Sequence, residues 1–277
     1  MRIALCNEVI GDMAFDEQCR FAATLGYDGL EVAPFTLGED PHQLPAPIVR
    51  ATRRSAADAG IAITGLHWLL VKPQGLSITS EDDAILKKTL EVGLRLVGLC
   101  AELGGSVLVH GSPKQRMLPA DGDGRAKARD RAVSYFEKVG RAAETAGVVY
   151  CVEPLGEAET NFINTVGDAA TLLDEIGVAG LKTMIDAKAA LQDEAQPIPD
   201  LLDQWLPTGA VAHIQLNDAD GSAPGLGETA FGPIMSALAR NAYAGVVAIE
   251  PFIYKPSGAA VAARAIGYLR GLEEAAQ

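Results

Sequence analysis

Four side chains that can bind a metal ion stand in or at the ends of four successive apolar runs in the second half of the chain: Glu153, Asp186, His213 and Glu250. Burying an unpaired carboxylate costs several kcal/mol, so a carboxylate at such a position usually meets a cation or a metal, or carries a proton. Three carboxylates and one imidazole suit Mn²⁺, Mg²⁺ or Co²⁺ better than an ion that prefers thiolates. The sequence therefore predicts one divalent-metal site formed by these four residues.

Each of these residues also has an ordinary explanation when it is taken alone. A lone histidine is usually a satisfied core or surface residue, and an acid just past a strand often caps the next helix. The case for a site is that four such residues recur on four consecutive strand-like runs.

The elements that would position these residues are short apolar runs alternating with amphipathic helical stretches. We expect strands at about residues 2–8, 29–33, 61–69, 106–110, 148–155, 181–185, 210–216 and 246–250. We expect helices at about residues 15–25, 47–59, 81–103, 125–146, 166–176, 199–205, 233–240 and 257–272, with Ser80 as the N-cap of the third. Eight such units in 277 residues predict an α/β protein, a single (β/α)₈ TIM barrel over residues 1–277.

The alternative to a barrel is a doubly wound open sheet. No Gly-x-Gly-x-x-Gly follows the first strand, and polar residues end six strands instead of gathering at one switch point. In a barrel neighbouring strands are about 4.8 Å apart, so the carboxyl ends of strands five to eight can bring their side chains to one point. His67 and His110 end strands three and four, so we expect both to face the same mouth.

The charge and the cysteines exclude several classes of function. The net charge of −13 and the sequence pI near 4.7 disfavour binding to nucleic acid or to anionic membranes. The four cysteines show no metal-type spacing, which indicates reduced core residues. The first residues start a strand directly, without a secretion signal, and no apolar run is long enough to span a membrane, so we expect a cytoplasmic protein.

Motifs around the four candidate ligands carry a family resemblance. They read Val-Glu153-Pro-Leu, Ile-Asp186-Ala-Lys, His213-Ile-Gln-Leu-Asn217-Asp218 and Ile-Glu250-Pro-Phe, with Gly26-Tyr-Asp-Gly-Leu-Glu31 and Gly65-Leu-His67 earlier in the chain. Together they resemble the xylose-isomerase-like barrel superfamily, which includes sugar-phosphate isomerases and epimerases, ketose 3-epimerases, inosose isomerases and dehydratases, and family-2 apurinic endonucleases. The resemblance covers nearly the whole chain and is specific to the superfamily, not to a substrate.

The resemblance implies a metal-dependent isomerase or epimerase of a sugar, keto-sugar or cyclitol. One divalent ion, with Mn²⁺ favoured and Mg²⁺, Co²⁺ or Zn²⁺ as alternatives, would stabilise the enediolate formed when a proton leaves the carbon next to a carbonyl. Glu153 and Glu250 match the two metal-binding glutamates that flank the substrate carbon, so one would take the proton and the other return it. Glu159 matches a substrate-contacting glutamate, with a solvated loop acid as the alternative.

Two substrate-contact positions depart from the ketose 3-epimerase pattern. Those enzymes carry a histidine where this chain has Ala189 and an arginine where it has Ala219. We predict that Lys188 supplies a cation to a substrate oxygen or acts as an acid, with an exposed lysine as the alternative. His67 and His110 are predicted to bind substrate hydroxyls, with a supporting role behind the site or simple packing as the alternatives. Lys114 and Arg116 are predicted to meet an anionic group of the substrate, such as a carboxylate or phosphate.

Three other functions remain as alternatives. A lyase or dehydratase of a keto-sugar or inosose would begin with the same proton abstraction. An apurinic endonuclease would need a histidine in place of Ala189 and an Asp-x-His in the loop after strand seven, which the chain lacks. A non-catalytic carbohydrate-binding barrel is the third. A small carbohydrate is the expected partner, and a homo-oligomer is compatible with the sequence because related barrels often dimerise or tetramerise.

Overall fold

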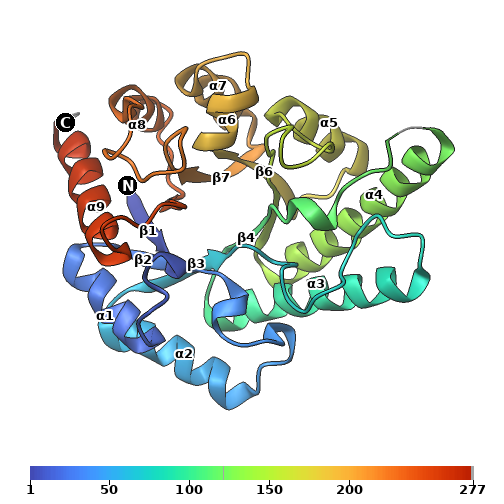
Figure 1. The fold of residues 1–277 in the computed structure, drawn as a ribbon, viewed down its shortest axis with the longest axis horizontal. Coiled ribbons are helices and arrows are strands. Elements are labelled where there is room, and N and C mark those ends of the chain that lie inside the picture. The colour runs from blue at the N-terminus through green and yellow to red at the C-terminus, as the bar shows by residue number, and fades with distance from the viewer. Residues whose placement is uncertain (121, 276–277) are drawn as a thin grey trace.

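The computed structural model describes residues 1–120 and 122–275. Eight parallel strands form a closed barrel in the order of the sequence, with β1 beside both β2 and β8 (Figure 1). This confirms the predicted (β/α)₈ TIM barrel. The strands are β1 Arg2–Cys6, β2 Gly29–Val32, β3 Ala62–Leu66, β4 Val107–His110, β5 Val149–Val152, β6 Leu181–Asp186, β7 Val211–Leu216 and β8 Val246–Ile249.

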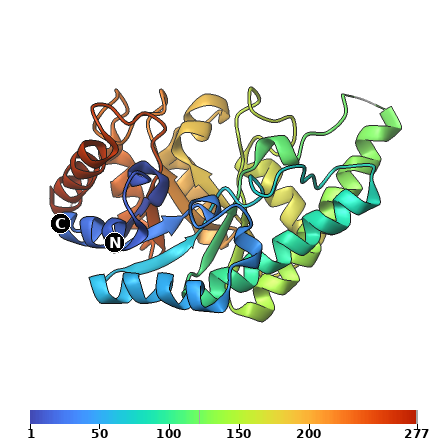
Figure 2. The same ribbon diagram turned by 60° about the horizontal axis from the view of Figure 1, so that its bottom comes forward.

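Helices surround the barrel and bury its outer face (Figures 1 and 2). They are α1 Phe15–Leu25, α2 Ala46–Ala59, α3 Asp83–Leu103, α4 Gly122–Ala146, α5 Val166–Ile176, α6 Ala187–Asp193, α7 Ile198–Trp205, α8 Phe231–Arg240 and α9 Gly258–Ala275. Met1 lies beside the last turns of α9, since its amino group is 2.7 Å from a carboxylate oxygen of Glu273. No helix of the described ranges is long and apolar enough to cross a membrane.

Several predicted boundaries differ from the structure for local reasons. The third strand ends at Leu66 instead of Leu69, because Trp68 takes a left-handed backbone conformation with φ of 53°. The third helix begins at Asp83, and Asp82, not Ser80, caps it by accepting a hydrogen bond from the amide of Ala84. Residues 187–193 were expected to be irregular, but they form α6 directly after β6.

Four buried residues of β4, β5 and β6 form a small apolar plug inside the barrel. Val107, Val109, Cys151 and Met184 form this inner cluster, while the large cluster lies between the strands and the surrounding helices. All four cysteines are buried, as their interpretation as core residues predicts. Side chains above the plug therefore point into the mouth at the carboxyl ends of the strands, which is where a barrel places its active site.

Candidate metal and sugar site

Three of the four predicted ligands meet at the mouth of the barrel. Glu153, Asp186 and Glu250 follow or end β5, β6 and β8, and each offers a carboxylate oxygen within 4.8 Å of the others. All three side chains are buried, with 4–7% of each residue exposed. The predicted convergence of these three carboxylates is therefore present.

The surroundings make three negative charges costly at this point. Burial, together with Glu250 and Asp186, raises the pKa of Glu153 well above its usual value. Burial also raises the pKa of Asp186 to about 6 and that of Glu250 to about 7. Carboxyl groups with raised pKa values hold protons near neutral pH unless a cation takes their place. The donor set and its electrostatics thus fit a divalent ion.

Hydrogen bonds hold Asp186 in a fixed orientation. Its Oδ1 accepts from the backbone amide of Ala189 at 2.8 Å, so Asp186 is also the N-cap of α6. Its Oδ2 accepts from Nδ2 of Asn217 at 2.8 Å. The same Nδ2 donates to the backbone carbonyl of Glu250 at 3.1 Å, so Asn217 joins the ends of β6, β7 and β8.

His213, the fourth predicted ligand, is not part of this cluster. In the register between β6 and β7 it pairs with Met184, whereas Asp186 pairs with Gln215. His213 therefore lies one inward-facing layer deeper, where its Nε2 is 2.7 Å from Oε2 of Glu31. The two atoms are not aligned as a hydrogen bond, so the contact is chiefly electrostatic. The structure therefore does not bring His213 together with the other three predicted ligands.

Gln215 lies level with Asp186, in the position that the sequence predicts for His213. Its Nε2 donates to Oε1 of Glu31 at 2.7 Å, while its Oε1 is buried and has no hydrogen-bond partner among residues 1–120 and 122–275. A buried amide oxygen without a partner is costly, and an amide oxygen is a good ligand for hard divalent ions. The segment His213-Ile-Gln215 offers two candidate ligands, because both side chains face inward. The register between β6 and β7 decides which of the two lies level with Asp186.

Glu31 supports both β7 residues from the opposite side of the barrel. It is fully buried on β2, which by itself would raise its pKa, but His213, His67 and Gln215 together lower the pKa below the usual value. A charged Glu31 fixes the amide of Gln215 with its nitrogen toward the carboxylate, which leaves the amide oxygen free. The sequence prediction noted Glu31 only as part of a motif.

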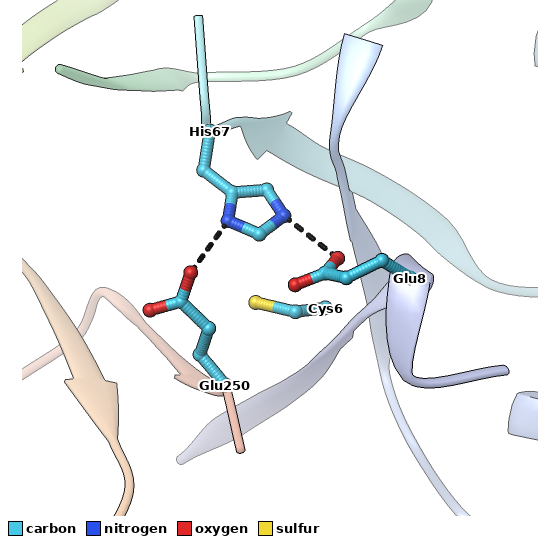
Figure 3. Close-up of side chains that lie close together, drawn as sticks. All are labelled: Cys6, Glu8, His67 and Glu250. Atoms are coloured by element: carbon cyan, nitrogen blue, oxygen red, sulfur yellow. Dashed lines mark hydrogen bonds and ion pairs between the residues drawn. The ribbon is translucent and has the colours of Figure 1, made fainter. Parts of the chain in front are cut away.

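Glu250 belongs to a second group of polar side chains (Figure 3). Nδ1 of His67 lies 3.0 Å from Oε1 of Glu250, and Nε2 of the same ring lies 3.0 Å from Oε2 of Glu8. Burial alone would lower the pKa of His67, but Cys6, Glu8 and Glu250 raise it well above its usual value. Nε1 of Trp68 also donates to Oε1 of Glu250 at 3.0 Å.

A cavity of about 440 Å³ opens over the carboxylates. His67, Trp68, Lys114, Glu159 and Lys188 line it together with Glu153, Asp186 and Glu250. Nζ of Lys188 is 2.8 Å from a carboxylate oxygen of Glu159 and 5.6 Å from the centre of the Phe252 ring. The positions of Lys114, Glu159 and Lys188 are therefore compatible with their predicted contacts with a substrate. Both ring nitrogens of His67 lie against carboxylates, which matches its alternative prediction as a residue that supports the site.

His110 and Arg116 do not line this cavity, so the structure does not bring them together with the other predicted substrate contacts. His110 faces outward from β4, where its Nδ1 is 2.7 Å from the hydroxyl of Tyr150 and its ring packs on Tyr135 and Phe136 of α4. Arg116 is fully buried and donates from Nη1 to the backbone carbonyl of Glu153 at 2.7 Å. Strand alternation reverses the side of His110, and Arg116 supports the chain at Glu153 instead of meeting an anion.

Comparison with known families agrees with this architecture. Residues 19–272 match the family described as xylose isomerase-like TIM barrel. The chain belongs to this family. Membership confirms the resemblance predicted from the motifs around the strand ends.

Relatives of known name are sugar epimerases. A ketose 3-epimerase of Arthrobacter globiformis is 28% identical over 79% of this chain and 74% of its own length. A D-psicose 3-epimerase of Agrobacterium fabrum is 27% identical over 83% of this chain and 77% of its length. A 3-dehydro-D-guloside 4-epimerase of Escherichia coli is 24% identical over 90% of this chain and 92% of its length.

Solved structures show the same fold at lower identity. The apo form of a 3-keto-D-glucoside 4-epimerase from E. coli superposes with a TM-score of 0.83 at 20% identity, covering 98% of this chain and 99% of the other. A D-psicose 3-epimerase determined in the presence of D-fructose gives a TM-score of 0.78 at 20% identity, covering 100% of this chain and 96% of the other.

Proposed function

We propose that this protein is a divalent-metal-dependent epimerase or isomerase of a sugar or keto-sugar. The observation that carries the proposal is the convergence of three buried carboxylates beneath a cavity large enough for a small carbohydrate. The names of the relatives support the reaction class, since they act on ketoses or oxidised glycosides.

Glu153, Asp186, Glu250 and Gln215 would hold the metal. Three carboxylates and one amide oxygen form an all-oxygen set, which suits Mn²⁺ or Mg²⁺ and makes Mn²⁺ our first choice. When bound, the ion would supply electrostatic stabilisation of the negative charge that develops on the substrate oxygen. It would also replace the protons that the carboxyl groups retain near neutral pH.

The protein's own groups move the proton. Glu153 and Glu250 approach the cavity from β5 and β8, so both carboxylates are placed to take a proton from a bound sugar and to return it. Proton removal by one glutamate and return by the other inverts the carbon, whereas return to the neighbouring carbon isomerises the sugar. Lys188, Glu159 and Lys114 line the cavity and would bind substrate oxygens.

Product analysis with a panel of sugars tests this function. Mn²⁺-loaded protein is incubated with ketoses, inososes and 3-keto-glycosides, and products are identified by NMR and mass spectrometry. We expect at least one substrate to give an epimer or isomer of unchanged mass, with activity lost after chelation. A product lighter by one water would instead show a dehydratase, and no product from any sugar would contradict the proposal.

A further inference from the structure

The carboxylate of Glu250 is held through one of its two oxygens (Figure 3). Oε1 has two donors, the ring nitrogen of His67 and the indole N–H of Trp68, each at 3.0 Å. No hydrogen bond from the described residues reaches Oε2. The structure therefore makes the two oxygens of one carboxylate unequal.

Glu8 holds the other end of the His67 ring. It lies just after β1, in a short 3₁₀ helix at Asn7–Ile10, and its carboxylate is 3.0 Å from Nε2 of His67. The neighbouring Asn7 is fully buried and bonds to Gln18, Thr36 and the amide of Ala33. This anchoring fixes the backbone at Glu8, so the position of the glutamate is defined by the fold.

Trp68 shows that the fold accepts strain to keep this arrangement. A bulky residue with φ of 53° is unusual, and such a conformation costs on the order of 1 kcal/mol or more. The strained turn after β3 presents His67 and Trp68 in succession to the same carboxylate oxygen. Backbone strain of this kind is commonly retained where a side chain must be aimed.

We propose that Glu8 and His67 are a positioning pair for Glu250. Glu8 holds the imidazole, the imidazole and Trp68 hold Oε1, and Oε2 is left as the oxygen that exchanges a proton with the substrate. The inference rests on the proposed function, in which Glu250 is one of the two proton-transfer groups. Glu8 does not line the cavity, so it acts through His67.

A second metal site is the competing explanation for the same four side chains, Cys6, Glu8, His67 and Glu250. In the structure the two ring nitrogens point in different directions, one at each carboxylate, and the carbon between them faces Cys6 (Figure 3). One ion can use only one of those nitrogens. The arrangement fits an imidazole that bridges the two carboxylates better than an imidazole that binds a metal ion.

Glu8→Gln tests the inference, because it keeps the size of the side chain and removes its charge. On a sugar that the wild type converts, we expect kcat to fall about 10- to 100-fold while KM and the Kd for Mn²⁺ remain within about twofold. Glu8→Asp keeps the charge and should recover part of kcat, and it serves as the test variant should Glu8→Gln not fold. Glu91→Gln, on the exposed face of α3, is the matched control.

The outcomes separate this inference from the function on which it rests. Equal kcat in Glu8→Gln and Glu91→Gln would overturn the positioning role alone, as would a loss confined to KM. Absence of turnover in the wild type on every sugar would overturn both. Calorimetric titration with Zn²⁺ that shows a second tightly bound ion, lost in Glu8→Gln, would make Glu8 a ligand and contradict the positioning role.

Discussion

Glu153 and Glu250 have different surroundings although both belong to one cluster. Oε1 of Glu250 is fixed by His67 and Trp68, whereas the contact of Arg116 at Glu153 goes to the backbone carbonyl and not to the carboxylate. Two carboxyl groups in unequal environments can take different roles in proton transfer. In the proposed function both transfer protons, and Glu250 is the one held more rigidly.

Glu153→Gln tests this assignment at neutral pH. The amide keeps the shape of the side chain and can still offer one oxygen to the metal, but it cannot accept the proton. With saturating Mn²⁺ we expect kcat to fall by about 10²- to 10⁴-fold in steady-state assays. Glu157→Gln, an exposed acid four residues further on, should remain close to the wild type. A Glu153→Gln enzyme with more than about half of the wild-type kcat would contradict the assignment.

Single residues show where reading the sequence succeeds and where it fails. Glu153, Asp186 and Glu250 could be predicted because each ends an apolar run, which fixes its height in the barrel. His213 and Gln215 could not be distinguished, because a register shift between Thr183 and Met184 sets their level. Such a shift depends on the neighbouring strand and leaves no local signal.

At the level of elements, the end of β4 limits the space around Glu153. A Cβ added at Gly111 would lie 2.2 Å from Oε2 of Glu153. We expect Gly111→Ala to displace this carboxylate and to lower kcat about tenfold or more, since small misplacements of reacting groups are costly. The unfolding free energy should change by less than about 1 kcal/mol, because the glutamate can rotate away.

Gly98→Ala is the matched control for that variant. Gly98 lies in α3 with open space around it, so alanine should raise the unfolding free energy by about 0.5–1 kcal/mol and leave kcat unchanged. Unchanged kinetics in Gly111→Ala would show that the β4 end does not constrain Glu153. Urea denaturation and steady-state kinetics on the two variants give both quantities.

His110, which packs between β4, β5 and α4, makes the stability of the fold depend on pH. Burial, aided by Arg116, lowers the pKa of His110 well below its ordinary value of 6.5. Below pH 6.5 the unfolded chain binds this proton more readily than the folded protein, so stability falls as the pH falls. His110→Phe removes the titration and keeps an aromatic ring beside Tyr135 and Phe136.

Urea denaturation of metal-free protein between pH 7 and 5 measures the effect. Relative to His110→Phe, the wild type should lose up to about 1.4 kcal/mol per pH unit below pH 6.5. Taking the difference between the two proteins removes the contribution of the other titrating groups. Parallel curves for the two proteins would mean that His110 keeps an ordinary pKa.

The elements themselves were predicted to different degrees. The prediction of Val166–Ile176 has the observed bounds, because Gly177 marks where the helix ends; in the structure Thr165 caps its first turn. Helix α6 was missed because it has only seven residues and its N-cap, Asp186, had been interpreted solely as a ligand. His110 was placed at the correct strand end but on the wrong face, since apolar neighbours on both sides hide the alternation of a buried parallel strand.

At the level of the whole molecule, the proposed metal site links ion binding to the stability of the fold, because its ligands come together only in the folded barrel. An ion that binds only the folded protein adds about 2.7 kcal/mol at 100 times its Kd. We expect Mn²⁺ to raise the thermal midpoint, and Gln215→Leu to weaken the Kd by about tenfold in calorimetry through loss of the amide oxygen. Gln204→Leu, at an exposed position on α7, is the control, and equal affinity in both variants would exclude Gln215 as a ligand.

The barrel could be predicted as a whole because eight repeated units leave few other arrangements. The sugar could not, because the residues that would select it, such as Lys188 and Glu159, come from loops and from helix α6 whose paths depend on packing. One barrel fold hosts many reactions, so fold membership narrows the chemistry without naming the substrate.

Incorporation of solvent deuterium tests the central claim most directly. Mn²⁺-loaded protein in D₂O, with each sugar of the panel, should introduce deuterium at a carbon next to the carbonyl of at least one of them. The rate should fall by about 10²-fold or more in Glu153→Gln and in Glu250→Gln. An epimer that forms without any deuterium at carbon, or deuterium that enters equally fast in both variants, would contradict proton transfer by these two glutamates.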